Sequence, residues 1–331
     1  MLYALKDGNS DNKFQQKTDK IAFKKEFITV PTDSLYNLRL FSEEINFKAT
    51  RPLLMSGEKI VFGYEGDYNK MHIELISDVP EEFDYSITKD IKADSLYYWY
   101  SPKLELDSLV FKISSMEFEK EYTVKLRDLK KDSLIIKPNV SGAIGIDEAF
   151  KINGSIPFKK FETSKITIMD KDSTMVDYST AFDTINNDYA FNFEKVQENI
   201  YSIQVLPEAF TDLFGNKNDT LNYKLRTKSE SDFGYARFTL INAKYPIILQ
   251  LTTENGDVKY EKYTTKPEAV DFLNISPGKY FIRAVFDTNG NKKFDTGNYL
   301  NKIQPEKVSH FKEIEIRADW GISENLEFIE D

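Results

Sequence analysis

The chain has 331 residues, of which 54 are acidic, 44 are basic and none is cysteine. The resulting net charge of −10 disfavours nucleic acid and anionic lipid headgroups as partners, because both would be repelled. The lack of cysteine excludes disulfides, thiol catalysis and cysteine-ligated zinc. A single core rarely grows beyond about 250–300 residues, so we expect two to four domains.

Short apolar runs, rich in aromatic and β-branched residues, are separated by Asp, Asn, Ser, Gly and Pro. Such runs are typical of β-strands bounded by turns. No long segment shows the 3.6-residue period of an amphipathic helix, and no apolar segment approaches the length of a membrane span. We therefore predict an all-β protein of tandem antiparallel sandwiches with little helix.

The first motif in chain order is a loop with side-chain oxygens at alternate positions, and it recurs near the other end of the chain. The two copies align without a gap, and the matched pairs are Asp7 with Asp287, Asn9 with Asn289, Asp11 with Asn291, Lys13 with Lys293 and Phe14 with Phe294. We interpret them as an internal repeat.

Residues 1–44 are predicted to be the C-terminal remnant of a sandwich. Two short β-like runs, 21–23 and 26–30, follow the first loop. In the second copy the sandwich begins near Tyr235, dozens of residues before Asp287, whereas six residues precede Asp7. A sheet cannot close with so little chain, so we expect the earlier strands of this domain to be missing.

Residues 45–138 are predicted to form the next sandwich, with a linker-like break at 138–142. In the run 70–76 the period of two places Ile73 on one face and His72 and Glu74 on the other. Several strands are expected to start directly after an Asp-Ser/Thr-Leu motif, since Asp and Ser or Thr hold their own backbone in a turn. The motif begins at five positions: Asp33, Asp94, Asp107, Asp132 and Asp219.

Residues 139–228 contain a complete set of short strands by pattern. The last part of this segment resembles the end of the bacterial Ig-like domain named after the S-layer protein SbsA. It runs from Leu206-Pro207-Glu208 through Asp212-Leu213-Phe214-Gly215-Asn216 to Leu225-Arg226-Thr227. The resemblance covers about one domain and implies an Ig-like sandwich there.

Residues 229–331 include a Pro-Gly-x-Tyr turn at 277–280 before a β-rich run, and look like a transthyretin-like or collagen-adhesin B-type sandwich. The whole arrangement, including Asp287-Thr288-Asn289-Gly290-Asn291 and Gln304-Pro305-Glu306, resembles a group of Bacteroidetes envelope lipoproteins. That resemblance implies architecture and a location in the periplasm or at the outer-membrane surface. The lipid-bearing cysteine leader of that group is not among these residues, so the location comes from the resemblance alone.

The repeated loops are the candidate metal sites, because a hard cation such as calcium needs six to eight oxygen ligands. Phe294 is expected to anchor the second loop in the core. The acid at position 12 and the glycine at position 6 of an EF-hand are missing, so any site is weak, with Kd of roughly 10⁻⁴–10⁻³ M. The alternative is a loop of Asx turns without an ion. The candidate ligands are Asp287, Asn289, Asn291, the Lys293 carbonyl, Asp295 and Asn298 in the second loop, and Asp7, Asn9 and Asp11 in the first.

No motif predicts catalysis. Neither His72 nor His310 has a nucleophile or base as a neighbour in the sequence, and no glycine-rich phosphate loop is present. The run Tyr97-Tyr98-Trp99-Tyr100 could stack on sugar rings if exposed, but a core position for one pair is the commoner arrangement. We therefore predict a non-catalytic structural or binding module of the cell envelope, with an unknown protein or polysaccharide as partner. The alternative is a carbohydrate-binding accessory region of a polysaccharide uptake or degradation system.

Overall fold

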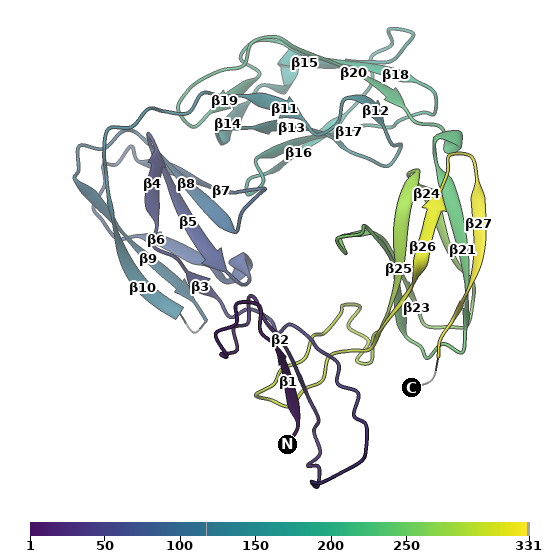
Figure 1. The fold of residues 1–331 in the computed structure, drawn as a ribbon. Coiled ribbons are helices and arrows are strands. Elements are labelled where there is room, and N and C mark those ends of the chain that lie inside the picture. The colour runs from purple at the N-terminus through teal and green to yellow at the C-terminus, as the bar shows by residue number, and fades with distance from the viewer. Residues whose placement is uncertain (117, 330–331) are drawn as a thin grey trace. The chain divides into compact units, whose positions relative to one another are not determined.

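The computed structural model describes residues 1–116 and 118–329, and the chain forms two compact units. One unit is 46–228; the other combines 1–45 with 229–331 (Figure 1). The helices in the described residues are three single 3₁₀ turns, η1 (Tyr68–Lys70), η2 (Thr163–Lys165) and η3 (Glu230–Asp232), and the rest of the regular structure is strand. The all-β prediction is confirmed. No described helix has the length and apolar character needed to cross a membrane.

The first sandwich of unit 46–228 packs a five-stranded sheet on a three-stranded one. The larger sheet consists of β3 (Lys48–Ala49), β4 (Leu53–Ser56), β5 (Lys59–Glu65), β7 (Asp84–Lys89) and β8 (Ser95–Ser101). The smaller sheet consists of β6 (His72–Leu75), β9 (Ser108–Ser115) and β10 (Phe118–Lys125). Between them the ring of Phe111 lies edge-on to Phe62 and Tyr98, each at 5.1 Å between centroids. The alternation predicted for 70–76 is observed, with Ile73 buried and His72 and Glu74 exposed.

The second sandwich of this unit has two four-stranded sheets and a short strand pair. One sheet contains β11 (Ile136–Pro138), β13 (Phe150–Gly154), β17 (Asp188–Asn192) and β16 (Ser179–Asp183). The other contains β12 (Gly142–Ile144), β20 (Leu221–Thr227), β18 (Ile200–Val205) and β15 (Ile166–Met169), and the pair is β14 (Phe158–Phe161) with β19 (Phe210–Asp212). The linker-like break after Pro138 lies inside this sandwich, between β11 and β12, because β11 already pairs with β13.

The third sandwich lies in the unit that contains 229–331. One sheet has β24 (Val270–Ile275), β21 (Gly234–Ile241) and β27 (Gly321–Glu327), with β21 and β27 parallel. The other has β23 (Val258–Thr264), β22 (Ile247–Thr252), β25 (Gly278–Phe286) and β26 (Val308–Ile316). Side chains from both sheets, among them Phe238 and Leu249, form one buried cluster.

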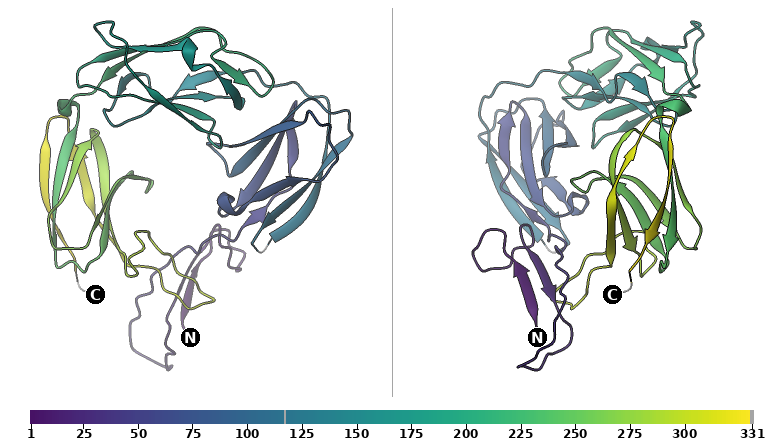
Figure 2. Two further views of the ribbon diagram at one scale, coloured as in Figure 1. Left: turned by 180° about the vertical axis from the view of Figure 1, so that it is seen from behind. Right: turned by 45° about the vertical axis from the view of Figure 1, so that its right-hand side comes forward.

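The same unit contains a two-stranded sheet near the N-terminus, β1 (Tyr3–Lys6) with β2 (Lys20–Phe23). Ile21, Phe23 and Phe41 form a small core there, against which Tyr299 packs. The strand predicted over 26–30 is wrong: the stretch has no strand, and the Phe27 side chain is 86% exposed. Figures 1 and 2 show it within a long loop. An isolated run of strand-forming residues stays irregular because its backbone N–H and C=O groups have no neighbouring strand to pair with.

Candidate functional site

The loop after β25 is organised around a buried carboxylate. Asp287 is 0% exposed, and its two oxygens accept the backbone N–H groups of Gly290, Asn291 and Lys292 at 2.8, 3.1 and 2.9 Å. Lys292 has a φ of +63°, a left-handed conformation that completes the curl of the chain around the carboxylate. This is the geometry of successive Asx turns.

The loop after β1 repeats this arrangement at its own first residue. The Asp7 carboxylate accepts the backbone N–H groups of Asn9, Ser10 and Asn12 at 3.1, 2.7 and 2.7 Å, and Asn12 has a φ of +60°. The hydrogen bond from the Asn12 N–H is the main cause that lowers the pKa of Asp7, because it stabilises the charged form. The internal repeat therefore extends from sequence to hydrogen-bond pattern.

A second carboxylate closes each loop from outside it. Glu306 accepts the N–H groups of the second and ninth residues of its loop, and Asp19 does the same in the first loop. Glu306 accepts the N–H groups of Thr288 and Asp295 at 2.7 and 3.1 Å. Asp19 accepts those of Gly8 and Gln15 at 2.9 and 2.8 Å. The ungapped alignment missed this pairing, because the chain between the loop and its closing acid is longer in the second copy. The acceptor pattern alone reveals the equivalence of Asp19 and Glu306.

The remaining predicted ligands behave differently from one another. The amide nitrogens of Asn289 and Asn291 both donate to one oxygen of Asp295, at 2.5 and 2.7 Å. Asn298 lies apart from this group in its hydrogen bonding, since its side chain accepts the N–H of Asn301. The expectation that Phe294 anchors the loop in the core is wrong: its side chain is 46% exposed.

The donor set suits a cation only in part. Among the described residues, no group of three or more His, Cys, Asp or Glu side chains has the geometry of a metal site. In the second loop the amide oxygens of Asn289 and Asn291 already accept backbone N–H groups, at 3.0 and 2.8 Å. An amide or carboxylate oxygen that accepts one hydrogen bond still has a second lone pair. Calcium would therefore share the amide oxygens of Asn289 and Asn291 with the backbone. Asp287 Oδ1 and Asp295 Oδ2 each accept two hydrogen bonds already, so these two carboxylates would have to bind the ion through their other oxygen.

We predict that calcium raises the stability of the full chain slightly and that the gain depends on Asp287. A tenfold excess of calcium over Kd stabilises the folded loop by about 1.4 kcal/mol. The measurement is the melting temperature in millimolar calcium and in chelator, for the wild type and for Asp287→Asn, which keeps the acceptor oxygen and loses the charge. Equal melting temperatures for the wild type in both buffers would identify the loops as hydrogen-bonded turns without an ion.

The aromatic run in β8 is not an exposed sugar platform. Tyr98 and Tyr100 are 1% and 3% exposed in the first core, and Trp99, on the opposite face, is 2% exposed. Tyr97 donates a hydrogen bond to Asp90, and burial together with this bond raises the pKa of Tyr97 to about 12. The core arrangement expected as the commoner one is therefore observed. The two histidines are both exposed, His72 in β6 and His310 in β26.

Trp99 lies at a seam inside unit 46–228. Its ring packs with Ile156 and Leu213 of the second sandwich, and the Phe214 ring is 6.3 Å away between centroids. The indole N–H donates to the Thr88 hydroxyl at 2.9 Å, so the ring is fixed in position. The outward-facing Trp99 of β8 is thus covered by the next sandwich.

A second set of contacts joins the same two sandwiches. The Lys159 ammonium lies 2.8 Å from the Asp84 carboxylate and donates to the Tyr85 carbonyl at 3.0 Å. The Lys89 backbone N–H donates to the Ile185 carbonyl at 2.7 Å. Together with Trp99, these contacts anchor β7 and β8 to the second sandwich at separate points.

A cleft of about 790 Å³ lies between these two sandwiches of unit 46–228. Tyr85, 50% exposed, contributes an aromatic face to it, and its ring stacks on Tyr98 at 4.9 Å. Apolar and polar side chains line it together, as in many small-molecule sites. The lining also includes Phe161, Phe182, Asn69, His72, Ser86, Lys159 and Thr184.

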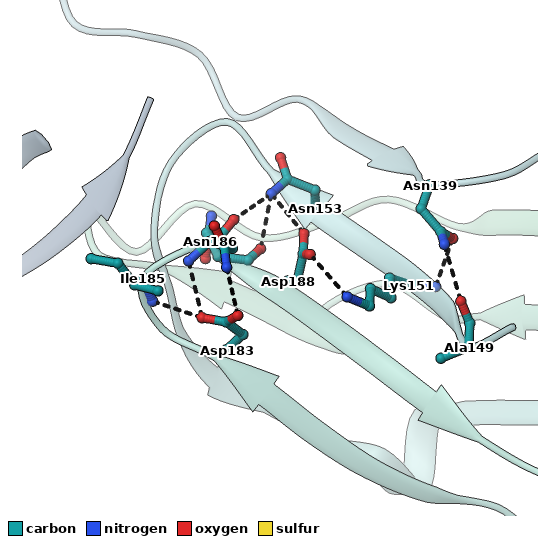
Figure 3. Close-up of polar contacts among 9 residues, drawn as sticks. Asn139, Ala149, Lys151, Asn153, Asp183, Ile185, Asn186 and Asp188 are labelled. Carbon is teal, nitrogen blue, oxygen red and sulfur yellow. Dashed lines mark hydrogen bonds and ion pairs between the residues drawn. The ribbon is translucent and has the colours of Figure 1, made fainter. Parts of the chain in front are cut away.

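The turn that carries Thr184 and Ile185 into this cleft is held by a polar network (Figure 3). Asp183 accepts the backbone N–H groups of Ile185 and Asn186 at 3.1 Å each, and the Asn186 amide at 2.7 Å. The Asn186 side-chain hydrogen bond is the main cause that lowers the pKa of Asp183. Asn153 of β13 donates to the Asn186 carbonyl at 2.7 Å, so the turn is tied to the sheet.

No protein-family model and no curated protein matches the chain. Among solved structures, the I67–I69 fragment of the titin I-band is similar at 14% identity and a TM-score of 0.18, over 73% of this chain and 94% of that one. The Bacillus anthracis TIE protein is similar at 12% identity and a TM-score of 0.21, over 87% of this chain and 58% of that one. Tandem Ig repeats of Dlar are similar at 11% identity and a TM-score of 0.18, over 56% of this chain and 97% of that one. At these identities and TM-scores the likeness carries no conclusion about function.

Proposed function

We propose that the chain is a non-catalytic module of the cell envelope, in which Ig-like sandwiches serve as a rigid spacer and binding scaffold. The observation that carries the proposal is the seam around Trp99, where two sandwiches share a buried tryptophan in addition to the connecting segment 126–135. A spacer must resist bending between its domains, and a buried apolar contact with flanking polar ties resists it better than an exposed linker does. The envelope location is supported by the resemblance of the whole arrangement to a group of Bacteroidetes envelope lipoproteins.

The location is tested by fractionating cells that produce the full-length protein and probing intact cells with protease. We expect the protein in the envelope fraction. Recovery in the cytoplasmic fraction would contradict the proposed location, while the rigidity of the seam would be unaffected.

The cleft supports carbohydrate binding as a second candidate function. It combines the Tyr85 and Phe161 rings with polar side chains such as Asn69, a combination that suits a neutral sugar. The test is titration of the full chain with neutral oligosaccharides, for the wild type and Tyr85→Ala. Tyr3→Ala serves as the control, since Tyr3 is also exposed and lies in the other unit. Binding that Tyr85→Ala abolishes and Tyr3→Ala keeps would support this function, and no binding by the wild type would remove it.

A further inference from the structure

The sheet of β24, β21 and β27 in the third sandwich holds an exposed aromatic side chain against its outer face (Figure 1). Buried and exposed residues alternate along β21, so Tyr235 and Arg237 point away from the core. Tyr235 pairs with Gly321 of β27, and a Cβ atom on Gly321 would lie 1.9 Å from the Tyr235 ring. The ring therefore lies over Gly321 along the surface of the sheet, an approach that only a glycine allows.

The strand on the other side of Tyr235 is irregular at the same level. The pairing of β21 with β24 shifts there, so that Tyr235 faces two residues of β24, Leu273 and Asn274. Both are exposed, and Asn274 has a φ of +55°, in the left-handed region. A β-bulge of this kind changes the direction in which side chains point from the sheet. The bulge thus places an apolar and an amide side chain beside the ring.

An ion pair lies on the same face, two residues further along β21. The Arg237 guanidinium donates to both carboxylate oxygens of Asp271 at 2.7 and 2.8 Å. The two side chains are 58% and 40% exposed, and together they carry no net charge. A guanidinium has further N–H donors, and a carboxylate oxygen that accepts one bond has a second lone pair. Both groups can therefore bond the hydroxyl groups of a ligand.

A second exposed ring belongs to the same end of the sheet. Trp320 directly precedes Gly321, and its carbonyl accepts the Tyr235 N–H at 3.1 Å. Trp320 is 64% exposed and Tyr235 54%. Exposed aromatic rings with polar groups beside them suit a ligand that is apolar on one face and polar at its rim.

The rest of the outer face is polar. Thr239 of β21 and Ser323 and Asn325 of β27 are exposed there. A stable protein partner needs about 800 Å² of surface on each side, with an apolar centre. One ring with a single leucine beside it falls short of that, whereas a sugar unit stacks on one aromatic ring and takes hydrogen bonds from the groups around it.

We propose that this end of the sheet binds a neutral polysaccharide, with one pyranose ring stacked on Tyr235. The hydroxyl groups of the sugar both donate and accept hydrogen bonds. Arg237 would donate to them, Asp271 would accept from them, and Asn274 would do either. The neutral ion pair favours an uncharged sugar over an acidic one. The site lies in a different unit from the cleft beside Tyr85, so it stands whether or not that cleft binds sugar.

The test is affinity electrophoresis of the full chain in gels that contain a soluble neutral glucan, mannan or xylan. We expect at least one of these polysaccharides to retard the wild type and Tyr235→Ala to weaken that affinity by about tenfold. Tyr235→Phe keeps the ring and should bind nearly as well as the wild type. Tyr3→Ala is the matched control, because Tyr3 is also an exposed strand residue of the same unit, and it should bind like the wild type.

Tryptophan fluorescence provides a measurement that does not depend on the folding of a Tyr235 variant. Trp99 is buried, so a change on addition of polysaccharide should come from Trp320 and be absent in Trp320→Ala. A wild type that none of the polysaccharides retards would overturn the proposal. Binding that Tyr85→Ala abolishes and Tyr235→Ala keeps would also overturn it and assign the sugar to the cleft. Self-association without polysaccharide that Tyr235→Ala abolishes would identify a second copy as the occupant, with the same consequence.

Discussion

Replacing Trp99 with alanine is expected to lower the free energy of unfolding of unit 46–228 by about 3–5 kcal/mol, the usual cost of truncating a buried tryptophan. The ring is 2% exposed and packs on Ile156 and Leu213 of the neighbouring sandwich. Its loss removes the apolar part of the seam, so the two sandwiches should also unfold less cooperatively. Chemical denaturation of the full chain, followed by circular dichroism, measures both effects.

The chain offers a matched control in its other tryptophan. Trp320 is 64% exposed, so Trp320→Ala should change the free energy of unfolding by less than about 1 kcal/mol. A Trp99→Ala variant as stable as Trp320→Ala would show that the seam contributes little to the fold.

Asn187→Ala should have an effect of similar size for a different reason. The Asn187 side chain, 3% exposed, donates to the carbonyls of Gly154 and Ile156 at 2.6 and 2.8 Å and accepts the N–H of Phe158 at 2.9 Å. Alanine leaves three buried backbone groups without this partner, at about 1–3 kcal/mol for each group that water cannot reach. We expect the free energy of unfolding to fall by about 3 kcal/mol or more, measured by chemical denaturation of the full chain.

The adjacent asparagine provides the control for this variant. Asn186 is exposed, and its side chain bonds Asp183 at the surface of the same turn. Asn186→Ala should therefore cost well under half of what Asn187→Ala costs. Equal losses for the two variants would mean that the turn as a whole, and not the buried amide, sets the stability.

Local patterns predicted the strands well wherever a partner strand was available. β8 and β9 begin at the Ser of an Asp-Ser-Leu motif, and β20 begins at the Leu of Asp219-Thr220-Leu221. The same motif at Asp33 leads into no strand. The motif sets a turn, but a strand also needs a neighbour to satisfy its backbone groups, and the local sequence does not say whether one is present.

The site was less accessible to sequence reasoning than the fold. The repeat identified Asp7 and Asp287, because their loops match residue by residue. Glu306 was missed as a closing acid because its distance from the loop differs from that of Asp19. The seam at Trp99 and the cleft beside Tyr85 depend on how two sandwiches meet, and residues far apart in the sequence build them.

In unit 46–228 each sandwich buries a core of its own, and the two sandwiches also contact each other. Phe111 and Ile203 belong to separate buried clusters, while Trp99 belongs to a third cluster that spans both sandwiches. The cleft lies between these two sandwiches and is lined by residues of both.

Residual dipolar couplings measured on the full chain show whether the two sandwiches of unit 46–228 move as one rigid body. Couplings from β5, β8 and β9 define the alignment of the first sandwich, and those from β13, β17 and β18 define that of the second. We predict that the two alignment tensors agree in magnitude and rhombicity, and that Trp99→Ala makes them differ. Tensors that already differ in the wild type would show that the two sandwiches move independently.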